Sequence, residues 1–139
     1  MRHRAAVLLV TSAVALLAGC SGESVVADPP SADVIFDRAQ QSADLLPADV
    51  ASLYDGDSSR YVGEDSAGDR YWAVKDQSAT ACILHLPADD PEEYLGFCGG
   101  PGLSGETAAG IVVEYASSPS QLDPDSAELV GDTLLVKRP

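Results

Sequence analysis

The stretch RYWAVKDQSATACILHL, residues 70–86, decides the fold of this chain. Its two ends, residues 70–75 and 80–86, are rich in the aromatic and aliphatic side chains that favour extended strands. Asp76-Gln77-Ser78, between them, has the polar composition of a turn. Two strands joined by so short a turn pair antiparallel, so we expect an antiparallel meander here.

The second of these strands divides its side chains between two faces, because successive side chains of a strand point to opposite sides of a sheet. Cys82, Leu84 and Leu86 share one face, and His85 lies on the other. The face with Cys82 is the better candidate for the core. We expect His85 to be a half-buried packing residue.

Patterns of period two and turn-forming residues continue on both sides of this stretch. They predict further short strands over residues 60–64, 94–98, 110–116, 127–130 and 133–137. Gly131-Asp132, between the last two, is typical of a two-residue hairpin turn that begins with glycine. The patterns together predict an antiparallel sheet of about six short strands.

Residues 31–46 carry the one plausible helical pattern. Apolar side chains recur there at helical spacing, from Ile35 to Leu46, and Pro47 would end the helix. Because this apolar face is thin, the helix would be stable only when docked on the sheet. The predicted fold class is α+β: a single domain over residues 31–139, with one antiparallel β-sheet and one N-terminal helix.

The first twenty residues predict export and lipid attachment. The chain begins with basic residues, continues with an apolar run over residues 5–17, and reaches Leu17-Ala18-Gly19-Cys20. This order is typical of a secretory signal peptide. With cysteine directly behind Leu-Ala-Gly, it resembles the signal of bacterial lipoproteins, whose cysteine carries acyl chains such as palmitate. We therefore expect residues 1–19 to be a signal peptide and Cys20 to hold the protein on the extracytoplasmic face of the cell membrane.

A transmembrane anchor and an ordinary secretory signal are the alternatives. The apolar run is shorter than the roughly 20 residues that cross a bilayer. An ordinary signal has no reason to place cysteine at position 20. Two acyl chains suffice for stable anchoring, since each buried methylene contributes about 0.8 kcal/mol. Residues 20–30 are small, polar and end in proline, so we expect them to form a flexible tether.

The chain is acidic, with a formal net charge of −14. Without residues 1–19, 22 acidic side chains would face six basic ones. Nucleic acids and anionic lipid headgroups bind positive patches, so the composition argues against both as partners. We expect the acids to form a solvated surface that binds divalent cations at most weakly.

Two cysteines remain once Cys20 is assigned to lipid, namely Cys82 and Cys98. Cysteine pairs in small exported domains form disulfides, because the extracytoplasmic environment is oxidising. We therefore expect a Cys82–Cys98 disulfide, and closing a loop of this length is worth roughly 3 kcal/mol. A metal site or a thiol nucleophile is the alternative. A zinc site would need two more ligands, and His85 is the only histidine after the signal segment.

The glycine-rich string GPGLSGET, residues 100–107, comes close to the phosphate-loop pattern G-x-x-x-x-G-K-[ST]. It departs from the pattern at Glu106, whose charge is opposite to that of the required lysine. This reversal removes the reason for nucleotide binding, so we expect the glycines to form a wide loop between strands. The sequence predicts no cofactor.

Ser104 and His85 are the candidates for a hydrolase. Ser104 lies in a near match to the G-x-S-x-G elbow, but Glu106 replaces the last glycine, and a strand pattern follows instead of a helix. His85 is the one candidate base, and it precedes the serine, which reverses the order of that family. We expect no enzyme, and a small extracellular hydrolase that uses Ser104 and His85 is the alternative function.

The segment Asp55-Gly56-Asp57-Ser58-Ser59 begins like a calcium-binding loop. An EF-hand loop then needs glycine at its sixth position and glutamate at its twelfth, where this chain has Arg60 and Ser66. We therefore expect a solvated turn and no metal site. A weak divalent-cation-binding module is a second alternative function.

Two segments are informative together. They are QQSADLLP (residues 40–47) and SSRYVG (residues 58–63), the latter leading to YWAV (residues 71–74), with Cys82-Ile83-Leu84 and Cys98-Gly99 further on. In this combination the chain resembles small uncharacterised lipoproteins of high-GC actinobacteria. The resemblance implies a lipid-anchored envelope protein, and it implies no activity, substrate or catalytic residue.

These observations converge on one class of function. The sequence predicts a lipid-anchored cell-envelope lipoprotein whose domain is a non-catalytic binding or interaction module. Cys20 would attach it to the membrane, and the sequence does not define its protein or ligand partner.

Overall fold

The computed structural model describes residues 32–90, 92–100, 102–115 and 123–139. Four strands form a first sheet: β1 (Asp55–Glu64), β2 (Arg70–Lys75), β3 (Ala81–Leu86) and β4 (Leu95–Cys98). Neighbouring strands are antiparallel throughout, in the order β1-β2-β3-β4. The meander predicted around residues 70–86 is therefore confirmed.

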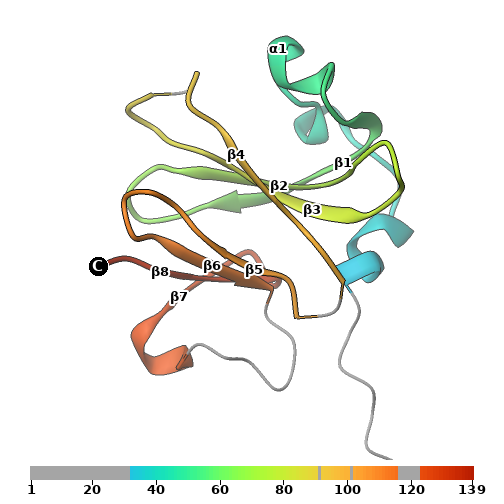
Figure 1. The fold of residues 1–139 in the computed structure, drawn as a ribbon. Helices are drawn as coiled ribbons and strands as arrows, with labels where there is room; N and C mark the ends of the chain where they lie inside the picture. The colour runs from blue at the N-terminus through green and yellow to red at the C-terminus, as the bar shows by residue number, and fades with distance from the viewer. Residues whose placement is uncertain (1–31, 91, 101, 116–122) are drawn as a thin grey trace, which may run out of the picture.

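A second sheet lies against the first (Figure 1). It is also antiparallel, has the order β5-β6-β8-β7, and consists of β5 (Ser104–Glu106), β6 (Val112–Tyr115), β7 (Glu128–Val130) and β8 (Leu134–Lys137). The predicted hairpin between β7 and β8 is present. Val130 pairs with Leu134, so residues 131–133 form its loop, which is one residue longer than predicted.

The predicted α+β class is wrong, because the described chain is mostly β with two sheets. In place of the helix over residues 31–46 there are two 3-10 helices, η1 (Ala32–Asp37) and η2 (Ser42–Asp44). A short α-helix, α1 (Ala48–Ala51), follows them, and η3 (Pro124–Ser126) precedes β7. Among the described residues, no helix has the length and apolar character that crossing a membrane requires.

Asp44 explains why the N-terminal segment does not continue as one helix. Its buried carboxylate accepts hydrogen bonds from both terminal nitrogens of Arg38, at 2.6 and 2.7 Å. It also accepts from the backbone N–H groups of Gln41 and Tyr61, both at 2.7 Å. A buried charge is costly unless it is paired, and the thin apolar face offers little in favour of a helix. The segment therefore takes the irregular path that brings these donors together.

Gln40 and Arg60 add further ties between this segment and β1. The side-chain nitrogen of Gln40 donates to Ser59 Oγ at 2.8 Å. Arg60 Nε donates to the carbonyl oxygen of Arg38 at 2.9 Å. The segments 40–47 and 58–63, quoted above for their resemblance, are therefore in direct contact in the fold.

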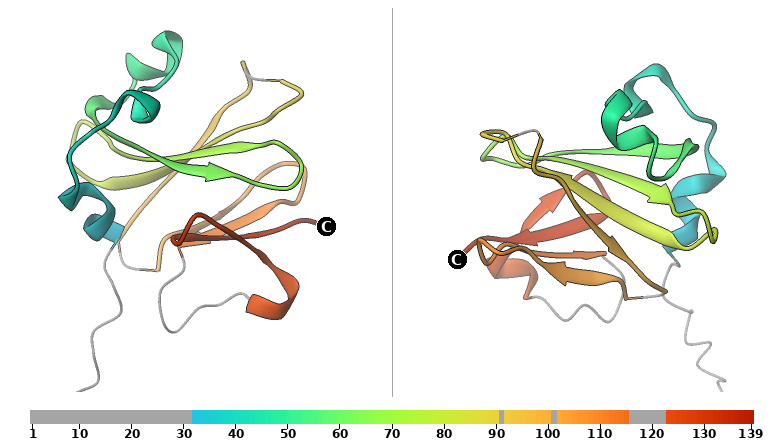
Figure 2. Two further views of the ribbon diagram at one scale, coloured as in Figure 1. Left: turned by 180° about the vertical axis from the view of Figure 1, so that it is seen from behind. Right: turned by 45° about the horizontal axis from the view of Figure 1, so that its top comes forward.

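The first sheet is buried on both faces. The larger core lies between the sheets and consists of Tyr71, Ala81, Ile83, Leu103, Ile111, Val113, Tyr115, Val130, Leu134 and Val136. The other face is covered by the N-terminal helical segment (Figure 2), above a second core of Val50, Trp72, Val74, Cys82, Leu84 and Leu86. The face of β3 that carries Cys82 is core, as predicted, but so is the face that carries His85.

Two glycines let the sheets approach closely at their edges. A Cβ on Gly105 of β5 would lie only 1.9 Å from the ring of Phe97 in β4. A Cβ on Gly131 would lie 2.5 Å from the carbonyl oxygen of Val62 in β1, and the φ of Gly131 is 56°. No other residue fits either place without displacing its neighbour. The sequence predicts a loop over residues 100–107. This prediction is wrong for residues 104–106, which form β5 and pair with β6.

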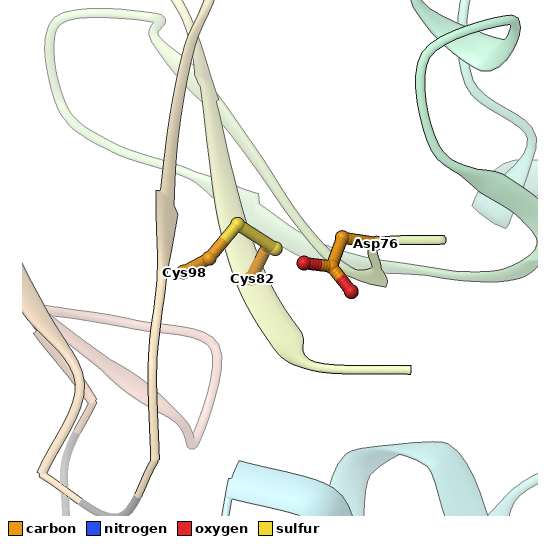
Figure 3. Close-up of side chains that lie close together, drawn as sticks. All are labelled: Asp76, Cys82 and Cys98. Carbon is orange, nitrogen blue, oxygen red and sulfur yellow. A yellow bond between two sulfur atoms is a disulfide. The ribbon is translucent and has the colours of Figure 1, made fainter. Parts of the chain in front are cut away.

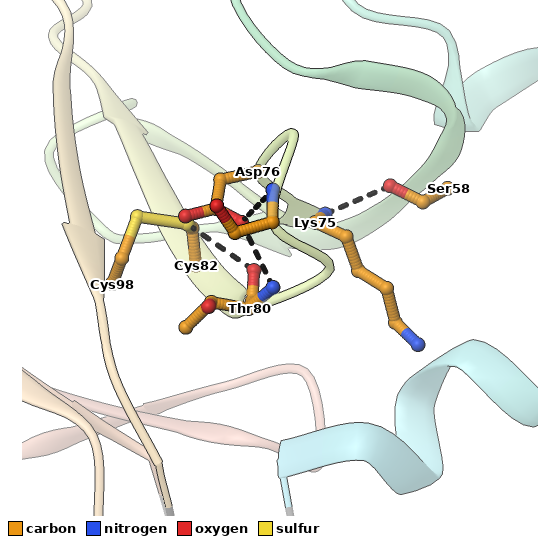
Figure 4. Close-up of a disulfide and its surroundings, with 7 residues drawn as sticks. Ser58, Lys75, Asp76, Thr80, Cys82 and Cys98 are labelled. Carbon is orange, nitrogen blue, oxygen red and sulfur yellow. Dashed lines mark hydrogen bonds between the residues drawn. A yellow bond between two sulfur atoms is a disulfide. The ribbon is translucent and has the colours of Figure 1, made fainter.

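The predicted disulfide is confirmed (Figure 4). Cys82 of β3 and Cys98 of β4 are directly opposite in the register, so the bridge fastens the edge strand of the first sheet to its neighbour. Asp76 lies beside it and closes the turn between β2 and β3. Its Oδ1 accepts hydrogen bonds from the backbone N–H groups of Ser78 and Thr80, both at 2.8 Å.

Replacing Asp44 by asparagine tests the tie between the N-terminal segment and β1. The hydrogen bonds from Arg38, opposed by burial, hold the pKa of Asp44 at about 2, below its ordinary value of 3.8. An acid with a lowered folded-state pKa stabilises the fold above its unfolded pKa, and this stability is lost as the pH falls toward the folded value. We expect Asp44→Asn to lower the free energy of unfolding by about 2 kcal/mol at neutral pH, measured in urea.

The difference between wild type and Asp44→Asn should shrink between about pH 5 and pH 2, because the wild-type carboxylate is protonated in that range. Asp37→Asn, at an exposed acid of the same segment, is the control and should change stability by less than about 0.5 kcal/mol. A stability difference that stays constant with pH would contradict the role given to the carboxylate.

Candidate functional site

One end of the molecule holds a cavity of about 530 Å³. The β1–β2 turn, the β3–β4 loop, the β5–β6 turn and the residue after β8 all contribute to its lining. These segments lie at the end of the sandwich where the C-terminus is marked (Figure 1). The volume is within the range of about 300–1,000 Å³ that small-molecule sites occupy.

A hydrogen-bonded cluster of five side chains lies next to this cavity, and three of them, Asp69, His85 and Arg138, line it. His85 Nε2 lies 2.8 Å from Asp69 Oδ2. Arg138, directly after β8, donates from one nitrogen to Asp65 Oδ2 at 2.5 Å and to Asp69 Oδ2 at 2.6 Å. The hydroxyl of Tyr71 donates to Asp65 Oδ2 at 2.9 Å. The cluster thus links the β1–β2 turn, β2 and β3 of the first sheet to the end of the second sheet.

The turn between β1 and β2 places both carboxylates. Asp65 Oδ1 accepts hydrogen bonds from the backbone N–H groups of Ala67 and Asp69, both at 3.0 Å. Gly68 completes the turn with a φ of 89°. Asp69 Oδ1 accepts from the N–H of Ala88 at 2.8 Å and so holds the β3–β4 loop against the same turn.

The surroundings shift the pKa values of Asp69, Arg138 and Tyr71. Burial raises the pKa of Asp69, but the hydrogen bonds from His85, Ala88 and Arg138 outweigh it, and the net shift is downward. Burial of Arg138 acts to lower its pKa, yet the hydrogen bonds to the two carboxylates raise it. Burial, together with the hydrogen bond to Asp65, raises the pKa of Tyr71. Asp65 and Asp69 both accept hydrogen bonds from the single guanidinium of Arg138.

The hydrogen bond to Asp69 decides where the proton of His85 lies. An ionised carboxylate only accepts hydrogen bonds, so Nε2 must be the donor. In the neutral ring this leaves a lone pair on Nδ1. Nδ1 is buried and has no hydrogen-bond partner among the described residues, although the ring lines the cavity. A buried acceptor left unpaired costs about 1–3 kcal/mol, so it needs an explanation.

The rest of the lining separates into apolar walls and an acidic rim. Pro87, Leu95 and Ile111, together with four alanines, supply apolar surface. Asp89, Asp90 and Glu93 are exposed acids at the edge of the same cavity. The site therefore combines a shaped apolar interior with a few polar groups, which is the composition of a small-molecule pocket.

The structure does not bring Ser104 to His85. Ser104 begins β5 and is exposed, whereas Thr107, directly beyond the other end of β5, lines the cavity. The two ring nitrogens of His85 are accounted for by Asp69 and by the unpartnered Nδ1, so no hydrogen bond joins the ring to Ser104. The expectation that His85 is a half-buried packing residue is wrong, since it is 2% exposed and hydrogen-bonded.

The predicted calcium-like turn is a strand. Asp55 and the four residues that follow it belong to β1, where the register is irregular. Ser58 Oγ donates to the carbonyl oxygen of Asp55 at 2.6 Å, and Ser59 Oγ donates to that of Gly56 at 2.8 Å. These hydroxyls are hydrogen-bonded to nearby backbone carbonyl oxygens, and the segment does not contain a complete set of calcium ligands.

Asp76, Cys82 and Cys98 are the one group of potential metal ligands that the described residues bring together (Figure 3). Their ligand atoms lie within 4.8 Å of one another. The two sulfur atoms are bonded to each other, however, and thiolates are the metal-binding form of cysteine. The carboxylate belongs to the turn described above, so the group is structural.

Comparison of the chain with protein-family models, with curated proteins and with solved structures found no match. The functional argument is therefore carried by the chemistry of the cavity. The predicted signal peptide (residues 1–19), the lipidation site Cys20 and the tether (residues 20–30) lie outside the described residues.

Sequence reasoning missed the three charged members of this site. Asp65 and Asp69 flank a turn, and turn acids are usually solvated, yet here they are only 5% and 6% exposed. One signal was present: a chain with eight basic residues places Arg138 directly behind an apolar strand, where its stem can be buried. That signal identifies a cation that needs a partner, but not which acids provide it.

Arg138→Met tests whether the cluster holds this end of the molecule together. Removing the guanidinium group leaves two buried carboxylates without a cation, so we expect the free energy of unfolding to fall by about 3 kcal/mol. Arg138→Lys should recover part of this loss, because an ammonium restores the charge without the planar fork. Lys137→Met, an exposed loss of the same charge one residue away, is the control. Equal stability of Arg138→Met and Lys137→Met in urea would contradict the role of the cluster.

Proposed function

We propose that this protein is a lipid-anchored cell-envelope lipoprotein whose domain is a non-catalytic module that binds a small molecule in the cavity at the Arg138 end. Cys20 is its membrane attachment in this proposal, through the signal described above. The disulfide Cys82–Cys98 supports an extracytoplasmic place, because disulfides persist in oxidising compartments.

The observation that carries the binding function is the cavity of about 530 Å³ and its mixed lining. Asp69, His85 and Arg138 are fixed in its wall by hydrogen bonds to one another, beside apolar side chains. Fixed polar groups in an apolar cavity give a ligand its orientation, which is what a binding module needs.

The same geometry favours binding over hydrolysis. A serine hydrolase requires the nucleophile within hydrogen-bond reach of the base. The hydroxyl of Ser104 makes no such bond to His85, and it lies at the end of β5 away from Thr107 and the cavity. The non-catalytic function is therefore the one we propose.

Filling the cavity tests the binding function. Ala109 lines the cavity and is exposed on the β5–β6 turn, so Ala109→Trp should occupy ligand space without disturbing the core. We expect saturation-transfer NMR with a panel of aliphatic amines, carboxylates, neutral amides and sugars to show at least one ligand that binds wild type and is lost in Ala109→Trp. Ala48→Trp, at an exposed alanine of α1, is the matched control and should retain binding. The absence of binding by every member of the panel would contradict the proposal.

The anchor has its own test. Cys20→Ser removes the thiol that would be acylated, so the protein should leave the membrane fraction of a bacterial expression host and appear in the soluble fraction. Intact-mass measurement of the wild-type product should show the added acyl chains. Unchanged sedimentation of Cys20→Ser with membranes would contradict the lipid anchor and leave the cavity proposal unaffected.

A further inference from the structure

The disulfide between Cys82 and Cys98 has two unequal ends. Cys82 of β3 belongs to the second core, beneath the N-terminal helical segment, and is only 1% exposed. Cys98 lies on the edge strand β4 and is exposed. A thiol from solution therefore meets the bridge at Cys98.

This asymmetry fixes the direction of thiol–disulfide exchange. An attacking thiolate forms a new S–S bond with Cys98 Sγ, the Sγ–Sγ bond breaks, and its electron pair leaves on Cys82 Sγ as a thiolate. A second thiol of a dithiol reagent then displaces Cys98 from the mixed disulfide. The reagent is thereby oxidised to a disulfide, and the protein takes up two electrons and two protons. The first step places a negative charge on the buried sulfur atom.

Asp76 places a charge of the same sign beside that sulfur atom. Its carboxylate points toward Cys82 (Figure 3), and one carboxylate oxygen lies within 4.8 Å of both sulfur atoms of the bridge. The turn between β2 and β3 holds the carboxylate there, through the hydrogen bonds from the backbone N–H groups of Ser78 and Thr80. Among the described residues, no basic side chain forms an ion pair with it.

The basic residue next to Asp76 in the chain does not balance this charge. Successive side chains of a strand point to opposite faces, so Lys75 lies on the face of β2 opposite to Val74, which shares the second core with Cys82. The ammonium group of Lys75 is 4.9 Å from the ring centroid of Phe36, and the side chain points away from the bridge (Figure 4). The electrostatic surroundings of the bridge are therefore set by the carboxylate.

Burial and charge act on exchange in the same direction. A thiolate on Cys82 would be buried, which is costly for a charge, and it would be repelled by the carboxylate of Asp76. The incoming thiolate meets the same repulsion. A sulfur atom on which negative charge is unfavourable is also a slow leaving group.

We infer that Asp76 protects the Cys82–Cys98 disulfide against exchange with thiols from solution. This role does not depend on ligand binding in the cavity. Among the described strands, β4 pairs only with β3, and it carries Leu95, which lines the cavity. The protected bridge keeps this edge strand, and with it one wall of the cavity, in place where small thiols or dithiol oxidoreductases are present.

Reduction rates of the full-length protein and of Asp76→Asn, both in detergent, test this role. Asparagine keeps an oxygen acceptor for the N–H groups of the turn and removes the charge. The reagents are dithiothreitol, which is uncharged, and dithiobutylamine, which carries an ammonium group. After quenching and alkylation, mass spectrometry of the peptide that contains Cys98 gives the reduced fraction without a contribution from Cys20.

We expect dithiothreitol to reduce Asp76→Asn about threefold faster than wild type, because the repulsion is gone. With dithiobutylamine the acceleration should be smaller, because the substitution also removes an attraction between the carboxylate and the ammonium group of the reagent. Asp132→Asn, at an exposed acid in the loop between β7 and β8, is the matched control and should leave both rates unchanged.

Equal rates of wild type and Asp76→Asn with dithiothreitol would overturn the inference. Equal acceleration by both reagents would overturn it as well, because an opened turn, unlike a lost charge, exposes the bridge to both reagents alike. The direction of exchange is checked with 2-mercaptoethanol, whose mixed disulfide with the protein is trapped by acid and located by peptide mass. We expect it on Cys98, and a mixed disulfide mainly on Cys82 would overturn the assignment of the buried sulfur atom as the leaving group.

Discussion

Two buried carboxylates that share one guanidinium hold this molecule together at its functional end. Asp65 and Asp69 come from a turn of the first sheet, and Arg138 comes from the chain directly after the last strand of the second. Buried charges of this kind are stable only with their partners in place. The hydrogen bonds from Arg138 to the two carboxylates therefore fix how the two sheets meet. The cavity, the orientation of His85 and the exposed acids of the β3–β4 loop all follow from that arrangement, because Asp69 also holds His85 and the N–H of Ala88.

The opposite side of the first sheet depends on the same kind of interaction. There Asp44 is buried, and it is satisfied by Arg38 and by the backbone of β1. In both places a short irregular segment is held by a carboxylate that accepts several hydrogen bonds, and most of the regular secondary structure lies in the two sheets. A strongly acidic chain thus uses two of its few arginines to pair with buried carboxylates and leaves most of its acids at the surface. That distribution leaves unpaired carboxylates at the cavity mouth.

The sequence predicts the parts of this fold that local rules govern. The β2–β3 meander, the β7–β8 hairpin at Gly131 and the Cys82–Cys98 bridge follow from alternation, turn residues and cysteine count. The helix over residues 31–46 does not form, because an irregular path lets Asp44 accept hydrogen bonds from Arg38, Gln41 and Tyr61. No local sequence pattern reveals these hydrogen bonds. Strand β5 has the sequence Ser-Gly-Glu, which has no strand propensity. It forms because it pairs with the edge of β6 and because Gly105, without a side chain, leaves room for the ring of Phe97. The site was missed for a related reason: burial of the turn acids Asp65 and Asp69 depends on Arg138, which lies far along the chain.

Measuring which ring nitrogen of His85 carries hydrogen tests the proposed hydrogen-bond cluster most directly. Multiple-bond proton–nitrogen correlation spectra of the imidazole ring, recorded at neutral pH on the ligand-free protein, distinguish a ring with hydrogen on Nε2 from one with hydrogen on Nδ1. The account predicts hydrogen on Nε2, donated to Asp69. Hydrogen on Nδ1 alone, with none on Nε2, would contradict it.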